Sequence, residues 1–334
     1  MTVRFGLLGA GRIGKVHARA VTENPDARLV AVADAVAPAA EALARQYDAD
    51  VRTIEAIEEA TDIDAVVICT PTDTHADLIE RFARAGKAIF CEKPIDLDVG
   101  RVKACLATVA ATGGKLMVGF NRRFDPHFRA VRQAIDEGSI GGVEMVNITS
   151  RDPGAPPVDY IRRSGGIFRD MTIHDFDMAR WLLGEEPTVV AAFASVLTDA
   201  EIGNAGDFDS VNVLLETPSG RQAVISNSRR ATYGYDQRIE VLGSDGMVAA
   251  QNQRAVAIEI ATGAGFRRPP LHDFFMTRYT EAYAAEIAAF VASLRDGAPL
   301  APSGEDGLKA LALAEAAVRS VAEGRKVKVS EVLA

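Results

Sequence analysis

Cysteine is scarce in this 334-residue sequence, which has only three, and long hydrophobic runs and runs of basic residues are missing. The three cysteines are Cys69, Cys91 and Cys105, an odd and small number that does not suit a disulfide framework. We therefore expect buried thiols in a protein of a reducing compartment, the cytoplasm. A catalytic thiol is the less favoured alternative.

The missing runs argue against further classes of protein. No apolar stretch is long enough to span a bilayer, and Val3 to Leu8 suits a strand better than a signal segment because a charge appears early, at Arg4. A net charge of −9 without a basic run argues against a nucleic-acid partner. The hydrophobic content of 48% is that of an ordinary globular protein, and a chain of this length favours two domains.

A glycine motif follows the first predicted strand. Gly9, Gly11 and Gly14 form the pattern G-x-G-x-x-G ahead of a helix-like stretch, Arg12 to Glu23. In a dinucleotide site the first glycine permits a tight turn, the second lets a pyrophosphate approach the backbone, and the third lets the helix pack on the strand. The pyrophosphate would lie at the helix N-terminus, where free N–H groups favour an anion. A glycine-rich turn without a ligand is the alternative.

Asp34 ends the second predicted strand, about 20 residues after the last glycine of the motif. The fingerprint expects an acid here to bind the ribose hydroxyls. Its charge would repel a 2′-phosphate, so NAD is favoured over NADP. The alternative is a loop aspartate that caps the next helix.

Strands and helices alternate over residues 1–119, which predicts a doubly wound parallel sheet, a Rossmann domain that binds NAD. Continuous apolar runs suit strands that are buried on both faces of such a sheet. After the first two strands, the expected strands are Asp64–Cys69, Lys87–Cys91 and Lys115–Gly119, and the expected helices are Pro38–Tyr47, Ile54–Ala60, Thr74–Ala85 and Asp98–Ala111.

In residues 120–334 the strict alternation of strands and helices ends, and successive strand-like runs follow one another. This pattern predicts an α+β domain with a large, mostly antiparallel open sheet, suited to substrate binding and oligomerisation. Turn signals separate successive strand-like runs. The expected strands are Val143–Ser150, Thr188–Leu197, Ser210–Glu216, Arg221–Ser228, Asp236–Leu242, Gly246–Ala250 and Ala255–Ile260. The expected helices are Pro126–Glu137, Thr172–Leu183, Phe275–Arg295 and Glu305–Glu323.

Two groups of residues are candidates for chemistry. Lys93 follows an apolar strand, and at the carboxyl end of a parallel sheet it would direct a cation into the ligand cleft; a surface turn is the alternative. Asp170 and His174 are four residues apart, so on a helix they share a face, and the carboxylate can orient a histidine that accepts a proton. A histidine bonded in a domain interface is the alternative. A metal site at His174, Asp175 and Asp177 is disfavoured because adjacent residues diverge on a helix, so we expect no metal.

In this order and spacing, the motifs resemble those of the glucose–fructose oxidoreductase/inositol dehydrogenase (Gfo/Idh/MocA) family over essentially the whole chain. The likeness rests on Gly9 to Gly14, Cys69-Thr70-Pro71 with His75, Glu92-Lys93-Pro94, Gly119 to Phe124, and Gly165-Gly166 followed by Asp170 and His174.

The resemblance implies an NAD-dependent dehydrogenase with the catalytic trio Lys93, Asp170 and His174. It implies that NAD is bound by Gly9, Ala10, Gly11, Arg12, Ile13, Gly14, Asp34, Thr70, Pro71, His75, Glu92 and Lys93. It implies that the substrate is bound by Lys93, Asn121, Arg122, Asp152, Asp170, His174, Tyr233 and Tyr235.

The stretches Ser164 to Asp177 and Tyr233 to Asp236 are most similar to inositol-oxidising members of the family. The resemblance therefore implies oxidation of a cyclic polyol, with myo-inositol and its 2-keto product favoured. A dehydrogenase of an aldose or another sugar, and an NAD-sensing regulator without turnover, stay open as alternatives.

The resemblance also implies a homo-oligomer, a tetramer or a dimer. Apolar alternation along Val211 to Leu215 and Val224 to Ser228 suggests that another subunit buries the open face of the second sheet.

Overall fold

The structure, a computed structural model, describes residues 2–334. Its contacts divide the chain into two compact units. The first unit holds the chain as far as Phe124 together with Glu281–Leu311, and the second holds Asp125–Thr280 and Ala312–Ala334. The boundary after residue 119 stays a prediction, and the return of residues 281–311 to the first unit has no signal in the sequence.

Six parallel strands form the sheet of the first unit, in the order β3-β2-β1-β4-β5-β6. They are β1 (Val3–Leu8), β2 (Ala27–Ala33), β3 (Asp50–Val51), β4 (Ala65–Ile68), β5 (Ala88–Glu92) and β6 (Leu116–Gly119). The strands β4, β5 and β6 are buried along their whole length, which explains why their sequences are continuous apolar runs. The predicted doubly wound parallel fold is confirmed.

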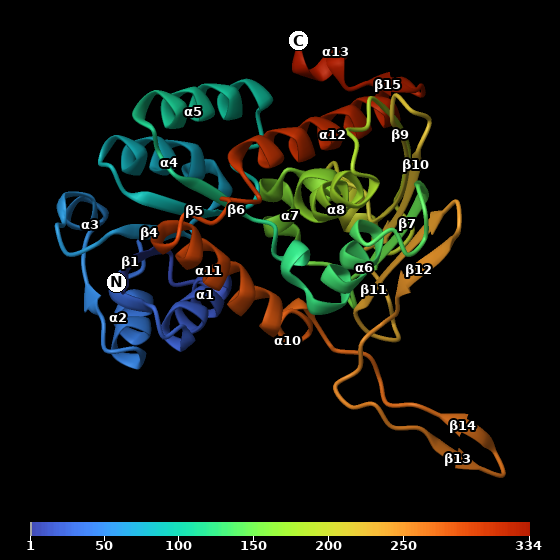
Figure 1. Cartoon of the computed structure of the whole chain (residues 1–334), viewed down its shortest axis with the longest axis horizontal. Helices are drawn as coiled ribbons and strands as arrows, with labels where there is room; N and C mark the ends of the chain where they lie inside the picture. The colour runs from blue at the N-terminus through green and yellow to red at the C-terminus, as the bar shows by residue number, and fades with distance from the viewer. Residues whose placement is uncertain (1) are drawn as a thin grey trace. The chain divides into compact units, whose positions relative to one another are not determined.

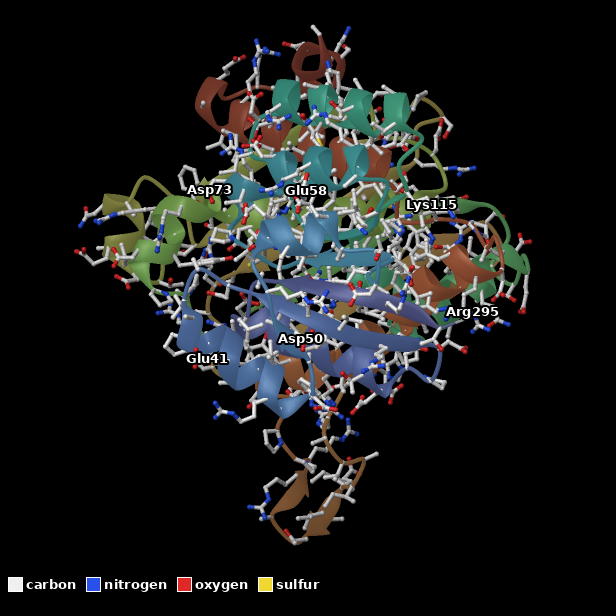
Figure 2. All side chains as sticks on the ribbon, turned by 90° about the vertical axis from the view of Figure 1, so that its left-hand side faces the viewer. Glu41, Asp50, Glu58, Asp73, Lys115 and Arg295 are labelled. Atoms are coloured by element: carbon white, nitrogen blue, oxygen red, sulfur yellow. The ribbon has the colours of Figure 1, made fainter. Side chains whose placement is uncertain are left out.

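Helices cover both faces of this sheet, as Figures 1 and 2 show from two directions. Helices α1, α2 and α11 share one apolar core with the strands, whereas α4 and α5 lie on the other face. The helices are α1 (Arg12–Glu23), α2 (Ala37–Gln46), α3 (Ile54–Glu59), α4 (His75–Arg84), α5 (Val99–Thr112) and α11 (Thr280–Arg295), with 3-10 turns η1 (Thr72–Thr74) and η2 (Asn121–Phe124). The side chain of Asp98 caps the start of α5, and Gly113, at φ 65°, ends it.

A mixed sheet forms the second unit, in the order β12-β11-β7-β10-β9-β8-β15. Only β7 and β10 run parallel among its described strands, so the sheet is mostly antiparallel, as predicted. The strands are β7 (Val143–Arg151), β8 (Val189–Ser195), β9 (Ser210–Glu216), β10 (Gln222–Ser228), β11 (Asp236–Gly243), β12 (Gly246–Ala250) and β15 (Val327–Lys328). The helices are α6 (Pro126–Asp136), α7 (Val158–Ser164), α8 (Ile173–Leu183), α9 (Ala200–Asn204), α10 (Phe275–Arg278) and α13 (Ser330–Leu333). Helix α12 (Gly304–Glu323) is divided between the two units after Leu311.

The alternation along β9 separates the two faces of the second sheet. Val211, Val213 and Leu215 are buried within the chain itself, whereas Leu214, between them, is 49% exposed. The expectation that a partner covers the apolar alternation of β9 is wrong in this detail, because the alternating valines form this chain's own core. The open face presents a different apolar set.

Three predicted elements differ in the structure. The strand expected at Ala255–Ile260 is wrong; β13 (Ile260–Thr262) and β14 (Gly265–Arg267) instead form a hairpin that extends from the second unit (Figure 1). The helix expected at Phe275–Arg295 is interrupted at Tyr279, where the backbone leaves the helical region at φ −111°; the Tyr279 side chain is buried. A π-helical turn, η3 (Phe168–Thr172), runs into α8, so helical structure begins before Thr172.

No helix of residues 2–334 combines the length and the apolar character that crossing a membrane takes.

Candidate active site

The glycine turn between β1 and α1 has the geometry of a dinucleotide cradle. Gly9 has φ +100°, which a side chain would strain, and a Cβ on Gly14 would lie 1.9 Å from the carbonyl oxygen of Gly9. A Cβ on Gly11 would meet no described atom within 4 Å, and no side chain caps the first turn of α1. Two glycines thus serve the fold, whereas Gly11 leaves open space at free N–H groups, which fits a pyrophosphate.

Two further predicted cofactor residues, Arg12 and Ile13, begin α1, and Arg12 is exposed. Asp34 follows β2 beside the glycine turn, where its carboxylate accepts the N–H of Ala10 at 2.6 Å and of Val36 at 2.7 Å. Asp34 therefore lies beside the glycine turn, and among the described residues no side chain caps the start of the next helix, α2. These contacts hold the acid at the edge of the cradle.

His75 ties two predicted cofactor loops together. Its ring is buried, with Nε2 2.8 Å from the carbonyl oxygen of Thr70 and Nδ1 2.7 Å from that of Pro94. Thr70 Oγ1 also lies 2.6 Å from Thr74 Oγ1, so the loop with Pro71 is held at the end of β4. Both ring nitrogens of His75 face the backbone, so the structure gives it a part in shaping the loops.

Glu92 and Lys93 diverge at the end of β5. The carboxylate of Glu92 turns into the protein, with Oε1 2.6 Å from Nε2 of His17, whereas Lys93 is partly exposed. His17 of α1 and Glu286 of α11 complete a buried cluster with Glu92. Sequence reasoning missed both; the available signal was Glu286, the single charged residue of the stretch from Ala282 to Val291.

Asn121 and Arg122 follow β6 in the turn η2, and both are buried. They therefore stand after the sixth strand, at the carboxyl edge of the sheet where β1, β4 and β5 end in the motifs described above. The first unit thus gathers the predicted cofactor residues along one edge, which is the edge where open α/β sheets bind ligands.

In the second unit, Asp170 lies in the π-helical turn that leads into α8. Its Oδ1 accepts the hydroxyl proton of Tyr160 at 2.8 Å, and its Oδ2 lies 3.5 Å from Nη1 of Arg229. Arg229 is buried and also donates to Asp207. The two contacts fix the orientation of the Asp170 carboxylate, and π-helical turns of this kind recur at functional sites.

His174 lies at the start of α8, next to an anchored aspartate. Asp175 is fully buried and accepts hydrogen bonds from Ser150 at 2.8 Å and from Asn227 at 2.9 Å, which fastens α8 to β7 and β10. Asp177 instead faces Arg180, at 3.5 Å. The acids beside His174 therefore point to different partners.

The remaining predicted substrate residues fall into two environments. Tyr233 is half exposed, donates its hydroxyl proton to Asp236 at 2.5 Å and accepts from Arg151; burial and the bond to Asp236 raise its pKa. Tyr235 is buried, with its ring 5.9 Å from that of Tyr279, so it is part of the core. Asp152 is partly exposed after β7 and its N–H donates to Ser228.

A doubly wound sheet with a glycine cradle, joined to a mixed-sheet unit rich in polar groups, defines a two-unit, NAD-dependent oxidoreductase. The chain belongs to the Gfo/Idh/MocA family. The family model described as "Oxidoreductase family, NAD-binding Rossmann fold" matches residues 3–120, and the "C-terminal alpha/beta domain" of the same family matches residues 132–329.

Several relatives match the chain from end to end. It is 76% identical to the inositol 2-dehydrogenase of Rhizobium meliloti (strain 1021), over 99% of this chain and 100% of that one. Among solved structures, the myo-inositol dehydrogenase of Corynebacterium glutamicum is 44% identical with a TM-score of 0.95, over 98% of this chain and 99% of that one. The scyllo-inositol dehydrogenase of Lactobacillus casei, solved with NAD(H) and scyllo-inositol, is 30% identical with a TM-score of 0.91, over 99% and 100%.

Proposed function

We propose that this protein oxidises myo-inositol to 2-keto-myo-inositol with NAD as the oxidant. The observation that supports myo-inositol as the substrate is the 76% identity, over 99% of the chain, to an inositol 2-dehydrogenase. The open space at Gly11, at an uncapped helix N-terminus, supports the cofactor.

In this proposal, His174 accepts the proton of the reacting hydroxyl, and Lys93 donates a hydrogen bond to the same oxygen and stabilises negative charge on it. Asp170, which Tyr160 and Arg229 hold in place, orients the substrate. NAD, when bound, supplies the acceptor for the hydride. Lys93 belongs to the first unit, and Asp170 and His174 belong to the second.

The other hydroxyls of a cyclic polyol need polar partners, because each buried hydroxyl without one costs about 1–3 kcal/mol. We propose Asn121, Arg122 and Asp152 for this role, together with the half-exposed Tyr233. Tyr235, buried among aromatic rings, is the weaker candidate because its ring serves the core.

The test is NADH absorbance with purified protein, NAD and a panel of myo-, scyllo- and D-chiro-inositol and glucose. We expect turnover on myo-inositol and a loss of kcat on the order of 10²- to 10⁴-fold in Lys93→Ala and His174→Ala. Lys115→Ala, an exposed lysine labelled in Figure 2, is the matched control. Turnover of glucose alone would move the proposal to a sugar dehydrogenase. Unchanged activity in Lys93→Ala would remove the catalytic trio.

We also propose a homotetramer built on the open face of the second sheet. Met145, Leu242 and Met247 are exposed neighbours across β7, β11 and β12, and Leu214 and Phe193 are exposed on β9 and β8 of the same sheet. Contiguous exposed apolar side chains of this kind mark association surfaces. Light scattering should give a particle mass that is a multiple of the 35.6 kDa chain mass, and the substitution Leu214→Glu should reduce this particle mass. A monomer at micromolar concentration would contradict the proposal.

We place the enzyme in the cytoplasm. The three thiols are free and buried, which suits a reducing compartment. Cell fractionation of the native source would test this location.

A further inference from the structure

A buried cluster of three titratable groups lies behind Lys93 in the first unit. It consists of His17 from α1, Glu92 from the end of β5 and Glu286 from α11. His17 and Glu286 are 0% exposed and Glu92 is 9% exposed. One polar atom from each lies within 4.8 Å of the others.

The carboxylate of Glu92 has a partner on each oxygen. Oε1 lies 2.6 Å from His17 Nε2, and Oε2 accepts the backbone N–H of Lys93 at 3.3 Å. A Cβ on Gly119, at the end of β6, would lie 3.3 Å from the carboxyl carbon of Glu92. The carboxylate thus occupies the space that the bare Cα of Gly119 leaves, and it holds the backbone of Lys93 directly.

Glu286 has a different environment. Neither of its oxygens has a hydrogen-bond partner among the described residues, and burial and the charge of Glu92 raise its pKa well above the ordinary value. The other titratable groups that face the cluster are the buried thiols of Cys69 and Cys91 and, against the His17 ring, Tyr283 at 5.6 Å. The two thiols are neutral near pH 7, since burial raises the pKa of both above 9.0.

A proton suits this cluster better than a metal ion. His17 Nε2 and Glu92 Oε1 point at each other at hydrogen-bonding distance, whereas metal ligands turn their lone pairs to a shared ion. The second oxygen of Glu92 is likewise occupied, by the Lys93 N–H.

We propose that His17, Glu92 and Glu286 form a buried support that positions Lys93 for the reaction, an inference that rests on the proposed function. The support links three elements: α1, which begins at the glycine cradle, β5, which ends at Glu92, and α11, which returns late in the chain. Through Glu92, the cluster fixes the backbone of Lys93 relative to α1, the helix that begins at the glycine cradle. The three are positioning residues, and Lys93 is the group that they serve.

The test compares Glu92→Gln, Glu286→Ala and Glu286→Gln with the unsubstituted protein, and uses Glu41→Gln, an exposed glutamate on α2 (Figure 2), as the control. We expect Glu92→Gln to lower kcat on the order of 10²-fold with little change in KM for the polyol or in NAD affinity, because a displaced catalytic group affects the chemical step. Glu286→Gln, which mimics a protonated acid, should restore most of the kcat that Glu286→Ala loses. A change in thermal stability with unchanged kcat in all variants would overturn the proposal.

A second readout separates this inference from the proposed function. Competitive labelling with acetic anhydride, read by mass spectrometry, measures the reactivity of Lys93 without any substrate. A changed labelling rate of Lys93 in Glu92→Gln, with an unchanged rate of Lys115, would favour the proposed positioning role of the cluster even if no polyol were turned over. An unchanged Lys93 rate would overturn it. A stoichiometric divalent ion in the purified protein, found by elemental analysis, would also overturn it.

Where Glu92→Gln does not fold, Glu92→Asp takes its place in both measurements, since a shorter carboxylate keeps the charge but cannot reach both partners. Far-ultraviolet circular dichroism identifies the variants that have folded.

Discussion

The second unit buries its aspartates beside cations or polar donors, whereas the first unit buries Glu286 with no hydrogen-bond partner on either oxygen among the described residues. In the second unit, Asp125 pairs with Arg278 and Asp207 pairs with Arg229, and all four side chains are buried. In the first unit, no described lysine or arginine forms an ion pair with Glu286, and its nearest titratable neighbours are His17 and Glu92.

The difference shows two ways of keeping a carboxyl group out of water. An arginine partner lets the carboxylate stay charged, at the price of depending on that partner, because an unpaired buried charge is strongly unfavourable. A protonated acid needs no cation, but its stability then depends on pH. The two units should therefore respond differently to substitution and to pH.

The largest effect is expected from breaking a buried pair of the second unit. Arg278→Met leaves Asp125 buried without its cation and removes the stacking of the guanidinium on Tyr279, 4.8 Å from the ring centre. We expect the free energy of unfolding to fall by about 3–5 kcal/mol. Urea unfolding measures this change.

The matched control is Arg268→Met, which breaks an exposed pair with Glu259 and should have little effect. Equal losses in the two variants would show that burial does not set the strength of these pairs.

The carboxylate of Asp209, in the second unit, is stabilised in its charged form by backbone N–H donors. Burial alone would raise its pKa, but hydrogen bonds from the N–H groups of Leu197 and Thr198 outweigh it and lower the pKa from 3.8 to about 2. The contribution to stability is therefore complete above pH 3.8 and is lost as the pH falls toward about 2. Asp209→Asn should lose about 2 kcal/mol at neutral pH.

The loss in Asp209→Asn should shrink when unfolding is measured near the acid end of this range. Asp159→Asn, which changes an exposed aspartate, should show no such trend. A loss that is constant from neutral to acid pH would contradict the assignment.

Glu286 should give the opposite dependence on pH. Its folded-state pKa is raised, so between its ordinary pKa of 4.5 and the raised value the unfolded chain releases a proton that the folded chain keeps. Stability therefore falls as the pH rises, by up to about 1.4 kcal/mol per pH unit from this group. Glu286→Gln removes this contribution.

Urea unfolding of both proteins at several pH values should show the stability of Glu286→Gln rising relative to the unsubstituted protein as the pH increases. Parallel curves would mean that folding does not raise the pKa of Glu286.

The smallest effect is expected at an exposed pair in the first unit. Arg19 and Glu23, one turn apart on α1, are both more than half exposed, so water and salt screen their attraction. Glu23→Gln should leave the unfolding midpoint unchanged within error. A clear shift of the unfolding midpoint would show that burial does not determine how much an ion pair of the first unit contributes to stability.

Patterns close together in the sequence predicted the first unit well. Apolar runs identified β4 and β5, and the spacing of Gly9, Gly11 and Gly14 identified the turn before α1, because each signal lies within one element and its next turn. The strand predicted at Ala255–Ile260 is wrong because that prediction also used only local sequence. A segment with β propensity does not form a strand unless a partner strand pairs with it.

Contacts between distant residues of each unit could not be predicted in this way. Nothing near Glu92 in the sequence indicates that Glu286 lies beside it, and nothing near Asp170 indicates Arg229. Within the candidate site, the residue types at the strand ends were predicted, but the groups that hold them were not.

The sequence by itself determined the order of strands and helices, the glycine cradle and the candidate residues Lys93, Asp170 and His174, because these depend on local periodicity and short motifs. Only the tertiary structure decided that α11 returns to the first unit and that Glu92 turns inward to His17, because the chain has to fold before burial can select which polar groups meet. The raised pKa of Glu286 follows from that burial and from the nearby charge of Glu92, and no local pattern in the sequence encodes it.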